Sequence, residues 1–195
     1  TCALPISKCS SRGWLTGYIL GASGGAQTAY HATIRDCECS TVYNGIQLTS
    51  KAEYCNVEAN YFEGIDEGTG ISDAGNYNKI IGNNMFSGFG IGINLHTTAF
   101  GGVCSNNTVA TATRPNTTCI LAGTASGLGK TVTNNTIIWG SSGGSIAGVV
   151  GLTVTGANAQ INLSGNVFSP KINWVGGAGS QQILDTTTST LSAGS

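Results

Sequence analysis

One short pattern recurs along most of this chain and limits what the chain can fold into. It consists of an apolar residue, two variable residues, Asn, one variable residue and a second apolar residue. The copies are Val57 to Phe62, Ile81 to Phe86, Cys104 to Val109, Val132 to Ile137 and Leu163 to Phe168, with an earlier copy, Ile34 to Cys39, that has Cys in place of Asn. The key positions are 37, 60, 84, 107, 135 and 166, so the spacing is 23 or 24 residues at first and then 28 and 31. A repeat of this length predicts a stack of similar units.

The composition of the repeat predicts an all-β fold. Strand-forming and turn residues are present, but the 3.6-residue spacing of a helix is not. We therefore expect a right-handed parallel β-helix of about six coils, stacked ~4.8 Å apart so that neighbouring coils bury their apolar positions. A second strand per coil is predicted where apolar residues follow glycine, as at Gly45 to Leu48 and Gly90 to Leu95. A leucine-rich repeat or a β-sandwich fits this period less well.

The same period divides the chain into three parts. Residues 1–31 do not match the repeat and are predicted to form an irregular first coil or a cap. Residues 32–175 are predicted to form the parallel β-helix. Residues 176–195 lose the period, and we expect a terminal strand around Ile183 and Leu184 followed by a tail, either disordered or joined to a further domain.

The recurrent asparagine has a structural explanation in such a stack. Asn tolerates a left-handed backbone at a tight corner, and its amide can bond to the Asn of the coil above and of the coil below. The asparagines are therefore interpreted as a ladder along one corner of the solenoid. This interpretation is preferred to a catalytic one.

The low charge of the chain excludes some partners. Only 9% of the residues are charged and the net charge is -1, without a Lys/Arg cluster. Nucleic acid and anionic membrane surfaces are therefore not expected as partners. No apolar run is long enough to span a bilayer. The seven cysteines are odd in number, and Cys39 and Cys104 fall at predicted core positions, which favours buried thiols over a disulfide framework.

The acidic residues are concentrated in the early coils. Eight of the nine lie between Asp36 and Asp73. Glycoside hydrolysis needs two carboxyl groups about 5 to 9.5 Å apart, and neighbouring coils could supply one each. The predicted acid and base pair is Asp36 with Glu58, with Glu63 or Asp66 in reserve. The alternative is that these carboxylates only make an otherwise uncharged module soluble.

Tyr61 is the preferred aromatic contact for a sugar ring. It alternates with Asn60 and Phe62 and should point outward, near Glu63 and Asp66. The other candidate aromatic residues are Tyr43, Tyr54, Tyr77, Trp139 and Trp174. Burial against a neighbouring coil or a partner subunit is an equally good explanation for each of them.

No cofactor or metal is expected. Asp66, Glu67 and Asp73 could gather calcium, but the chain has no calcium-loop motif. His31 and His96 belong to different coils and are interpreted as surface or turn residues.

The Asn corner followed by an aromatic or β-branched residue resembles the pectate-lyase-like right-handed β-helices, and among them most of all the bacteriophage tailspike and tail-fibre proteins. The resemblance covers about Ala32 to Val175. It implies a homotrimer that binds or cleaves a bacterial surface polysaccharide. It does not extend to a named enzyme family, because the chain lacks an Asp-Asp pair and has only Arg12, Arg35 and Arg114 as arginines.

These observations lead to one functional hypothesis and two alternatives. The leading hypothesis is a phage tailspike or tail-fibre module that recognises a bacterial surface glycan, with or without cleaving it, in the virion tail or outside the cell. One alternative is a secreted polysaccharide lyase or glycoside hydrolase. The other is a structural subunit of a virion or an extracellular filament.

Overall fold

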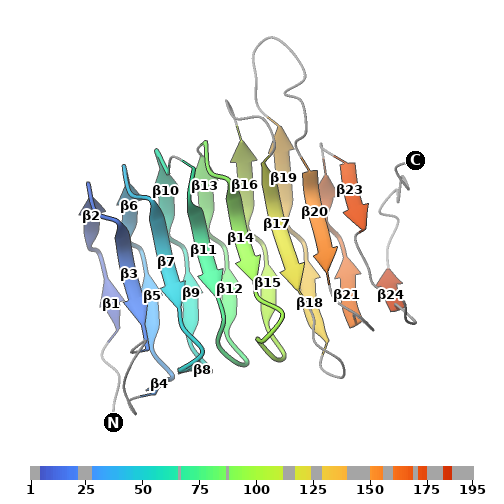
Figure 1. The fold of residues 1–195 in the computed structure, drawn as a ribbon, viewed down its shortest axis with the longest axis horizontal. Coiled ribbons are helices and arrows are strands. Elements are labelled where there is room, and N and C mark those ends of the chain that lie inside the picture. The colour runs from blue at the N-terminus through green and yellow to red at the C-terminus, as the bar shows by residue number, and fades with distance from the viewer. Residues whose placement is uncertain are drawn as a thin grey trace.

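The computed structural model describes residues 5–21, 28–65, 67–86, 88–111, 117–123, 129–139, 150–155, 160–168, 171–174 and 182–185. Within these ranges the regular secondary structure consists entirely of β-strands, and none of it is a helix that could cross a membrane. Every paired strand is parallel to its neighbours, and Figure 1 shows the coils following one another from the N-terminal to the C-terminal end. The expected all-β parallel β-helix is confirmed.

Three parallel sheets run along the length of the molecule, and each coil adds one strand to each sheet. The first sheet contains β1 (Ile6–Ser7), β5 (Thr33–Arg35), β9 (Asn56–Glu58), β12 (Lys79–Ile81), β15 (Val103–Ser105), β18 (Lys130–Thr133), β21 (Gln160–Ser164) and β24 (Gln182–Asp185). The second contains β2 (Ser10–Arg12), β6 (Glu38–Ser40), β10 (Tyr61–Glu63), β13 (Asn84–Phe86), β16 (Thr108–Thr111), β19 (Thr136–Trp139) and β22 (Val167–Phe168). The third contains β3 (Thr16–Leu20), β7 (Asn44–Leu48), β11 (Thr69–Asp73), β14 (Ile91–Leu95), β17 (Thr118–Gly123), β20 (Val150–Thr155) and β23 (Lys171–Trp174). A short fourth sheet pairs β4 (Ala29–Tyr30) with β8 (Ala52–Glu53).

The number of coils is larger than the repeat predicts. Among the described residues, seven coils each supply one strand to all three long sheets, and β24 is the eighth strand of the first sheet. The additional coil comes from β1, β2 and β3, which pair in parallel with β5, β6 and β7. Its sequence lacks the Asn pattern because the position before β2 is occupied by Cys9.

The core is a set of apolar columns that follow the register of the sheets. In the third sheet, equivalent positions of successive strands hold Ile46, Ile71, Ile93, Ile120 and Leu152, all buried. Cys39 and Cys104 are also fully buried, which confirms that they act as small apolar core residues. A single coil cannot cover its own apolar residues, so their burial depends on the coils above and below.

The glycines of the third sheet lie within the strands instead of only leading into them. A Cβ atom on Gly45 would come within 2.4 Å of the carbonyl oxygen of Gly70, and a Cβ on Gly70 within 2.6 Å of that of Gly92. No side chain fits there without moving the backbone. Glycine as the second residue of β7 and β11 therefore leaves room for the backbone carbonyl group of the next coil.

The predicted asparagine ladder is present along the corner between the first and second sheets. The Oδ1 atom of Asn83 accepts hydrogen bonds from the backbone N of Asn60 (3.0 Å) and from its Nδ2 (2.9 Å). The Nδ2 atom of Asn83 donates to Val57 O (2.9 Å) and to Asn107 Oδ1 (3.0 Å). The same arrangement continues through Asn107, Asn135 and Asn166. The ladder satisfies buried polar groups from one coil to the next.

Two details of the ladder differ from the sequence expectation. In the fourth coil the ladder residue is Asn83 and not Asn84, which is exposed on β13; accordingly Met85 is buried and Phe86 is exposed. The left-handed residue is not the ladder asparagine but the residue before it, as with Asp36 (φ 52°), Ala59 (φ 54°) and Gly82 (φ 66°). The Ile80-Ile81 and Asn83-Asn84 pairs made both registers compatible with the pattern, and only the packing of neighbouring coils decides between them.

The two adjacent asparagines of the fourth coil provide a matched test of the ladder. We expect Asn83→Ala to lower the free energy of unfolding by on the order of 3 kcal/mol, because the buried Asn60 N and Val57 O of the preceding coil lose these partners. The control, Asn84→Ala, should change it by less than about 0.5 kcal/mol because this side chain is exposed. Urea denaturation followed by circular dichroism measures both. Equal losses for the two variants would contradict the ladder assignment.

Candidate functional site

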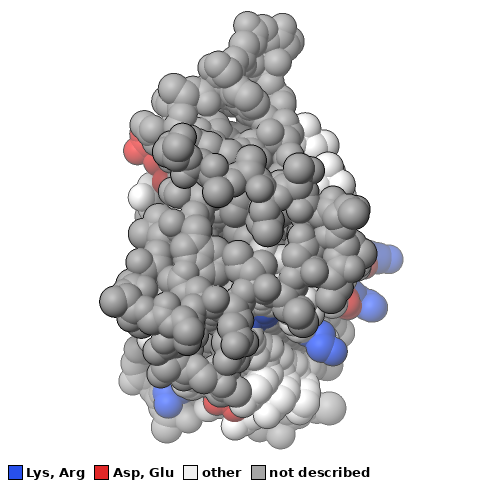
Figure 2. Space-filling model, turned by 90° about the vertical axis from the view of Figure 1, so that its right-hand side faces the viewer, with Lys and Arg blue, Asp and Glu red and all other residues white. Residues whose placement is uncertain are grey.

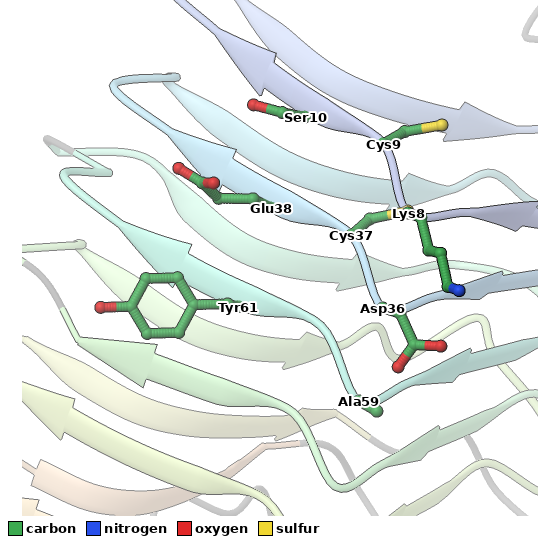
Figure 3. A pocket seen from close by; sticks show the side chains of 8 residues that line it. All are labelled: Lys8, Cys9, Ser10, Asp36, Cys37, Glu38, Ala59 and Tyr61. Carbon is green, nitrogen blue, oxygen red and sulfur yellow. The ribbon is translucent and has the colours of Figure 1, made fainter.

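An open pocket with a volume of about 460 Å³ lies at the corner between the first and second sheets, on the first three coils. Its lining combines charged, thiol and aromatic side chains from three successive corners: Lys8, Cys9, Ser10, Asp36, Cys37, Glu38, Ala59 and Tyr61. Figure 3 shows Glu38 and Tyr61 on neighbouring strands of the second sheet, while Lys8 and Asp36 extend from the corner itself. The fold thus brings both charge signs and an aromatic ring into one hollow.

Glu38 is held as an anion on the outer face of β6. Its Oε1 atom accepts hydrogen bonds from Arg12 Nη2 (2.8 Å) and from Ser40 Oγ (3.0 Å). These bonds, the one from Arg12 first, lower the pKa of the Glu38 carboxyl below its usual value. Because Arg12 is exposed, we attribute little stability to this ion pair. Its effect is to fix the position of a negative charge beside the pocket.

Tyr61 extends from β10, directly next to Glu38 in the register of the second sheet. Its side chain is 40% exposed. The hydroxyl group lies 3.4 Å from Glu63 Oε2, and the ring centroid lies 5.9 Å from that of Phe86 at an interplanar angle of 37°. Partial burial and then the nearby Glu63 carboxylate raise the pKa of the Tyr61 hydroxyl, so it stays a hydrogen-bond donor. An exposed aromatic ring beside fixed carboxylates is therefore available to a ligand.

The structure brings some of the predicted site residues together and separates others. Asp36 and Tyr61 share the pocket, and Glu63 lies next to Tyr61 on β10. Glu58 lies on β9 in the first sheet, where its backbone O accepts a hydrogen bond from Asp36 N (3.4 Å), but its side chain does not line the pocket. Asp66 lies outside the described residues.

Sequence reasoning missed two charged residues that line this pocket, Lys8 and Glu38. Lys8 belongs to the first coil, which does not show the repeat, although its left-handed backbone (φ 55°) matches that of Asp36. Glu38 could have been found from the register, because it holds the position equivalent to Tyr61 one coil earlier.

The other predicted aromatic residues do not provide open ring faces of the same kind. The rings of His31, Tyr54 and Tyr77 stack along the corner before the first sheet, with centroids 5.5 Å and 5.1 Å apart. Stacked rings expose their edges, whereas a sugar packs on a ring face, so this column is better suited to joining coils than to binding a glycan. Tyr43 is exposed at another corner, and the side chains of Trp139 and Trp174 lie outside the described residues.

Asp73 is a carboxyl group inside the apolar core. It occupies the column that holds Leu48 in the coil before and Leu95 in the coil after. Its Oδ1 atom accepts hydrogen bonds from Gly75 N (3.0 Å) and Asn78 Nδ2 (2.8 Å), while Oδ2 is buried without a hydrogen-bond partner. Burial raises the pKa of Asp73 to about 6, although the bonds from Asn78 and Gly75 and the charge of Lys130 oppose this shift.

Lys130 lies in the same part of the core and fixes the turns around it. Its Nζ atom donates hydrogen bonds to the backbone O atoms of His96 (2.7 Å), Ala99 (2.9 Å) and Gly123. Burial lowers the pKa of Lys130 to about 8, and the carboxylate of Asp73 acts in the opposite direction. Three carbonyl groups therefore replace water around a buried ammonium group.

No cluster of three His, Cys, Asp or Glu side chains suited to a metal ion occurs in the part of the chain that the structure describes. Of the suggested calcium ligands, Asp73 faces the core and Glu67 is exposed. These two carboxylates do not share a surface loop. Seen from the C-terminal end, the described Lys, Arg, Asp and Glu residues form small separate groups and not a broad patch of one sign (Figure 2).

Comparison with known proteins agrees with the solenoid architecture. Residues 4–168 match the family model described as right handed beta helix region, and the chain belongs to this family. No curated protein shows significant similarity to the chain. Among solved structures, an alginate lyase from Paenibacillus sp. str. FPU-7 is similar to the chain, with 14% sequence identity and a TM-score of 0.39, over 89% of this chain and 80% of that one.

The buried carboxyl of Asp73 should make stability depend on pH. Because its folded pKa is raised above its unfolded value, its protonation stabilises the fold below pH ~4, and this contribution is lost as the pH rises through about 6. Asp73→Asn keeps an acceptor for Gly75 and Asn78 but does not ionise. The natural chain should lose stability as Asp73 ionises, whereas the variant should not. The free energy of unfolding of the variant, relative to that of the natural chain, should therefore rise by up to roughly 3 kcal/mol between pH 4 and pH 7. Urea denaturation of both proteins at pH 4, 5, 6 and 7 measures the difference, and parallel curves would contradict the assignment.

Proposed function

We propose that this chain is a module of a bacteriophage tailspike or tail fibre, and that the pocket lined by Asp36, Glu38 and Tyr61 binds a bacterial surface polysaccharide. The observation that carries the proposal is the exposed Tyr61 ring beside a carboxylate fixed by Arg12. Sugar recognition combines an aromatic face for the apolar side of the ring with charged or planar polar groups that bond to hydroxyls.

The position of the pocket on the solenoid favours an extended ligand over a single sugar. Equivalent outward positions recur along the second sheet, with Glu38, Tyr61 and Asn84 in register on successive strands. Phe86, 42% exposed, continues the aromatic surface beyond Tyr61. Because strands fix the backbone at these positions, no loop has to become ordered when a chain of sugars lies along them.

The viral setting and the homotrimer belong to the same proposal. A surface poor in charged groups leaves apolar side chains exposed, notably Trp14 (68%) and Leu15 (76%) in the turn between β2 and β3. Ile19 is also exposed on β3 nearby in sequence. Exposed apolar groups of this size often mark a contact between subunits, and packing of three copies would cover them in the virion tail.

The contribution of Tyr61 can be tested by replacing it with alanine. Loss of the ring should weaken the binding of capsule or lipopolysaccharide fragments at least tenfold, because a sugar face loses its apolar partner. Tyr43→Ala is the matched control, since Tyr43 is similarly exposed and lies outside the pocket. A glycan array identifies a ligand and calorimetry measures both variants against it. Equal affinity of the two variants would reject the pocket, and light scattering of the same samples tests the trimer.

Cleavage of the polysaccharide is a second candidate function. The observation that supports it is the backbone hydrogen bond from Asp36 N to Glu58 O, which joins these two residues on adjacent coils. Adjacent coils are ~4.8 Å apart, so carboxyl groups on them can reach the separation used by glycoside hydrolases.

For this second function we expect Asp36→Asn and Glu58→Gln each to reduce the release of reducing ends from the bound polysaccharide at least 100-fold, with binding retained. The measurement is a reducing-sugar assay on the polysaccharide found by the array. Glu53→Gln, which changes a carboxylate on β8 outside the pocket, is the control. Unchanged release in both variants would remove these residues from any catalytic role.

A further inference from the structure

A serine and a histidine meet on the outer face of the third sheet, away from the pocket. The Oγ atom of Ser72 lies 2.9 Å from Nε2 of His96. This contact joins two coils, because Ser72 lies on β11 and His96 follows β14. Both residues are half-buried, so they are accessible from solvent.

The register of the third sheet creates this contact. Ser72 and Asn94 are direct neighbours on β11 and β14, and both point outward because Ile71 and Ile93 beside them are buried. The backbone N of His96 donates to Asp73 O (2.9 Å), and its backbone O accepts from Lys130 Nζ (2.7 Å). The turn is therefore held by hydrogen bonds on both sides of His96.

The hydrogen bonds around the imidazole identify the nitrogen that can act as a base. The Nδ2 group of Asn94 lies 3.1 Å from the same Nε2 atom, and an amide NH₂ can only donate. With the Asn94 amide in this orientation, Nε2 is the acceptor and the imidazole proton is on Nδ1. With Nε2 as acceptor, the hydroxyl of Ser72 donates its proton along the 2.9 Å contact.

The surroundings keep the imidazole in this neutral form. Partial burial, and secondly the charge of Lys130, lower the pKa of His96. A serine hydroxyl within hydrogen-bond distance of a neutral imidazole has the geometry of a nucleophile and its base.

We propose that Ser72 and His96 form a nucleophile and base pair that hydrolyses O-acyl esters, such as acetyl esters on sugar hydroxyls. Ser72 Oγ attacks the acyl carbon and passes its proton to His96 Nε2. The bond to the sugar oxygen breaks, and that oxygen takes the proton from Nε2 as the alcohol leaves. Water then attacks the acyl-serine with the same base, which releases the carboxylic acid and restores the hydroxyl of Ser72.

Asn94 has a positioning role in this scheme. In the resting site one N–H of its amide shares the lone pair of His96 Nε2 with the hydroxyl of Ser72. When Nε2 takes the proton, that contact breaks, and the amide N–H groups become available to the negative oxygen of the tetrahedral intermediate. The choice of a sugar ester rests on the proposed function, because the ligand proposed there is a polysaccharide, whose hydroxyl groups can carry acyl esters. The hydrolysis itself does not depend on that function.

The test uses the whole chain, a fluorophosphonate probe and p-nitrophenyl acetate. The probe should label Ser72, as located by mass spectrometry of peptides, and Ser72→Ala and His96→Gln should each lower ester hydrolysis at least 100-fold. Ser50→Ala, which removes an exposed hydroxyl in the turn after β7, should leave the rate unchanged. Denaturation midpoints check that the variants are folded.

The outcomes separate this proposal from the glycan-binding pocket. Absence of label on Ser72 in the natural chain overturns the nucleophile assignment, and this result does not require Ser72→Ala to fold. Equal ester hydrolysis by the folded Ser72→Ala and Ser50→Ala variants overturns it as well. Because the small ester does not need the pocket, failure of glycan binding in the Tyr61 experiment leaves this result unaffected. Loss of labelling in His96→Gln, with the fold retained, supports the base role over a purely structural contact.

Discussion

The structure depends on parallel coils placed in register, so that each coil satisfies the polar groups of the next. Backbone hydrogen bonds satisfy these groups within the three sheets. The asparagine ladder satisfies them at the corner, where the chain passes from the first sheet to the second. A buried amide that lost its partner would cost more free energy than one hydrogen bond contributes. The ladder therefore fixes the register of the strands that enter and leave the corner from β9 to β22.

This register decides which side chains meet, because residues on successive coils form columns. In the third sheet an inward column of aliphatic residues includes one carboxyl, Asp73, and the shifted pKa of Asp73 follows from that column. The outward column beside it brings Ser72 next to Asn94. Chemical groups that are more than 20 residues apart in the sequence thus become neighbours through the repeat alone.

The fold could be predicted further than the site because the two depend on different information. A repeated Asn with apolar flanks is sufficient to indicate stacked coils, and the buried thiols of Cys39 and Cys104 follow from their place in that pattern. The site depends on the register and on turn geometry. The pairing of Asp36 with Glu58 stays a prediction. Glu38, two residues after Asp36, lines the pocket with Asp36 and Tyr61.

The sequence by itself determined the parallel solenoid, the corner that carries the ladder and the concentration of acidic groups at the early coils, because these follow from period and composition. Only the tertiary structure decided that Asn83 and not Asn84 enters the ladder, that β1 to β3 complete a coil without the Asn pattern, and that His96 lies against Ser72. The physical reason is that a shift of one residue reverses which side chains face the core. Both registers fit the local sequence, and only the packing of neighbouring coils distinguishes them.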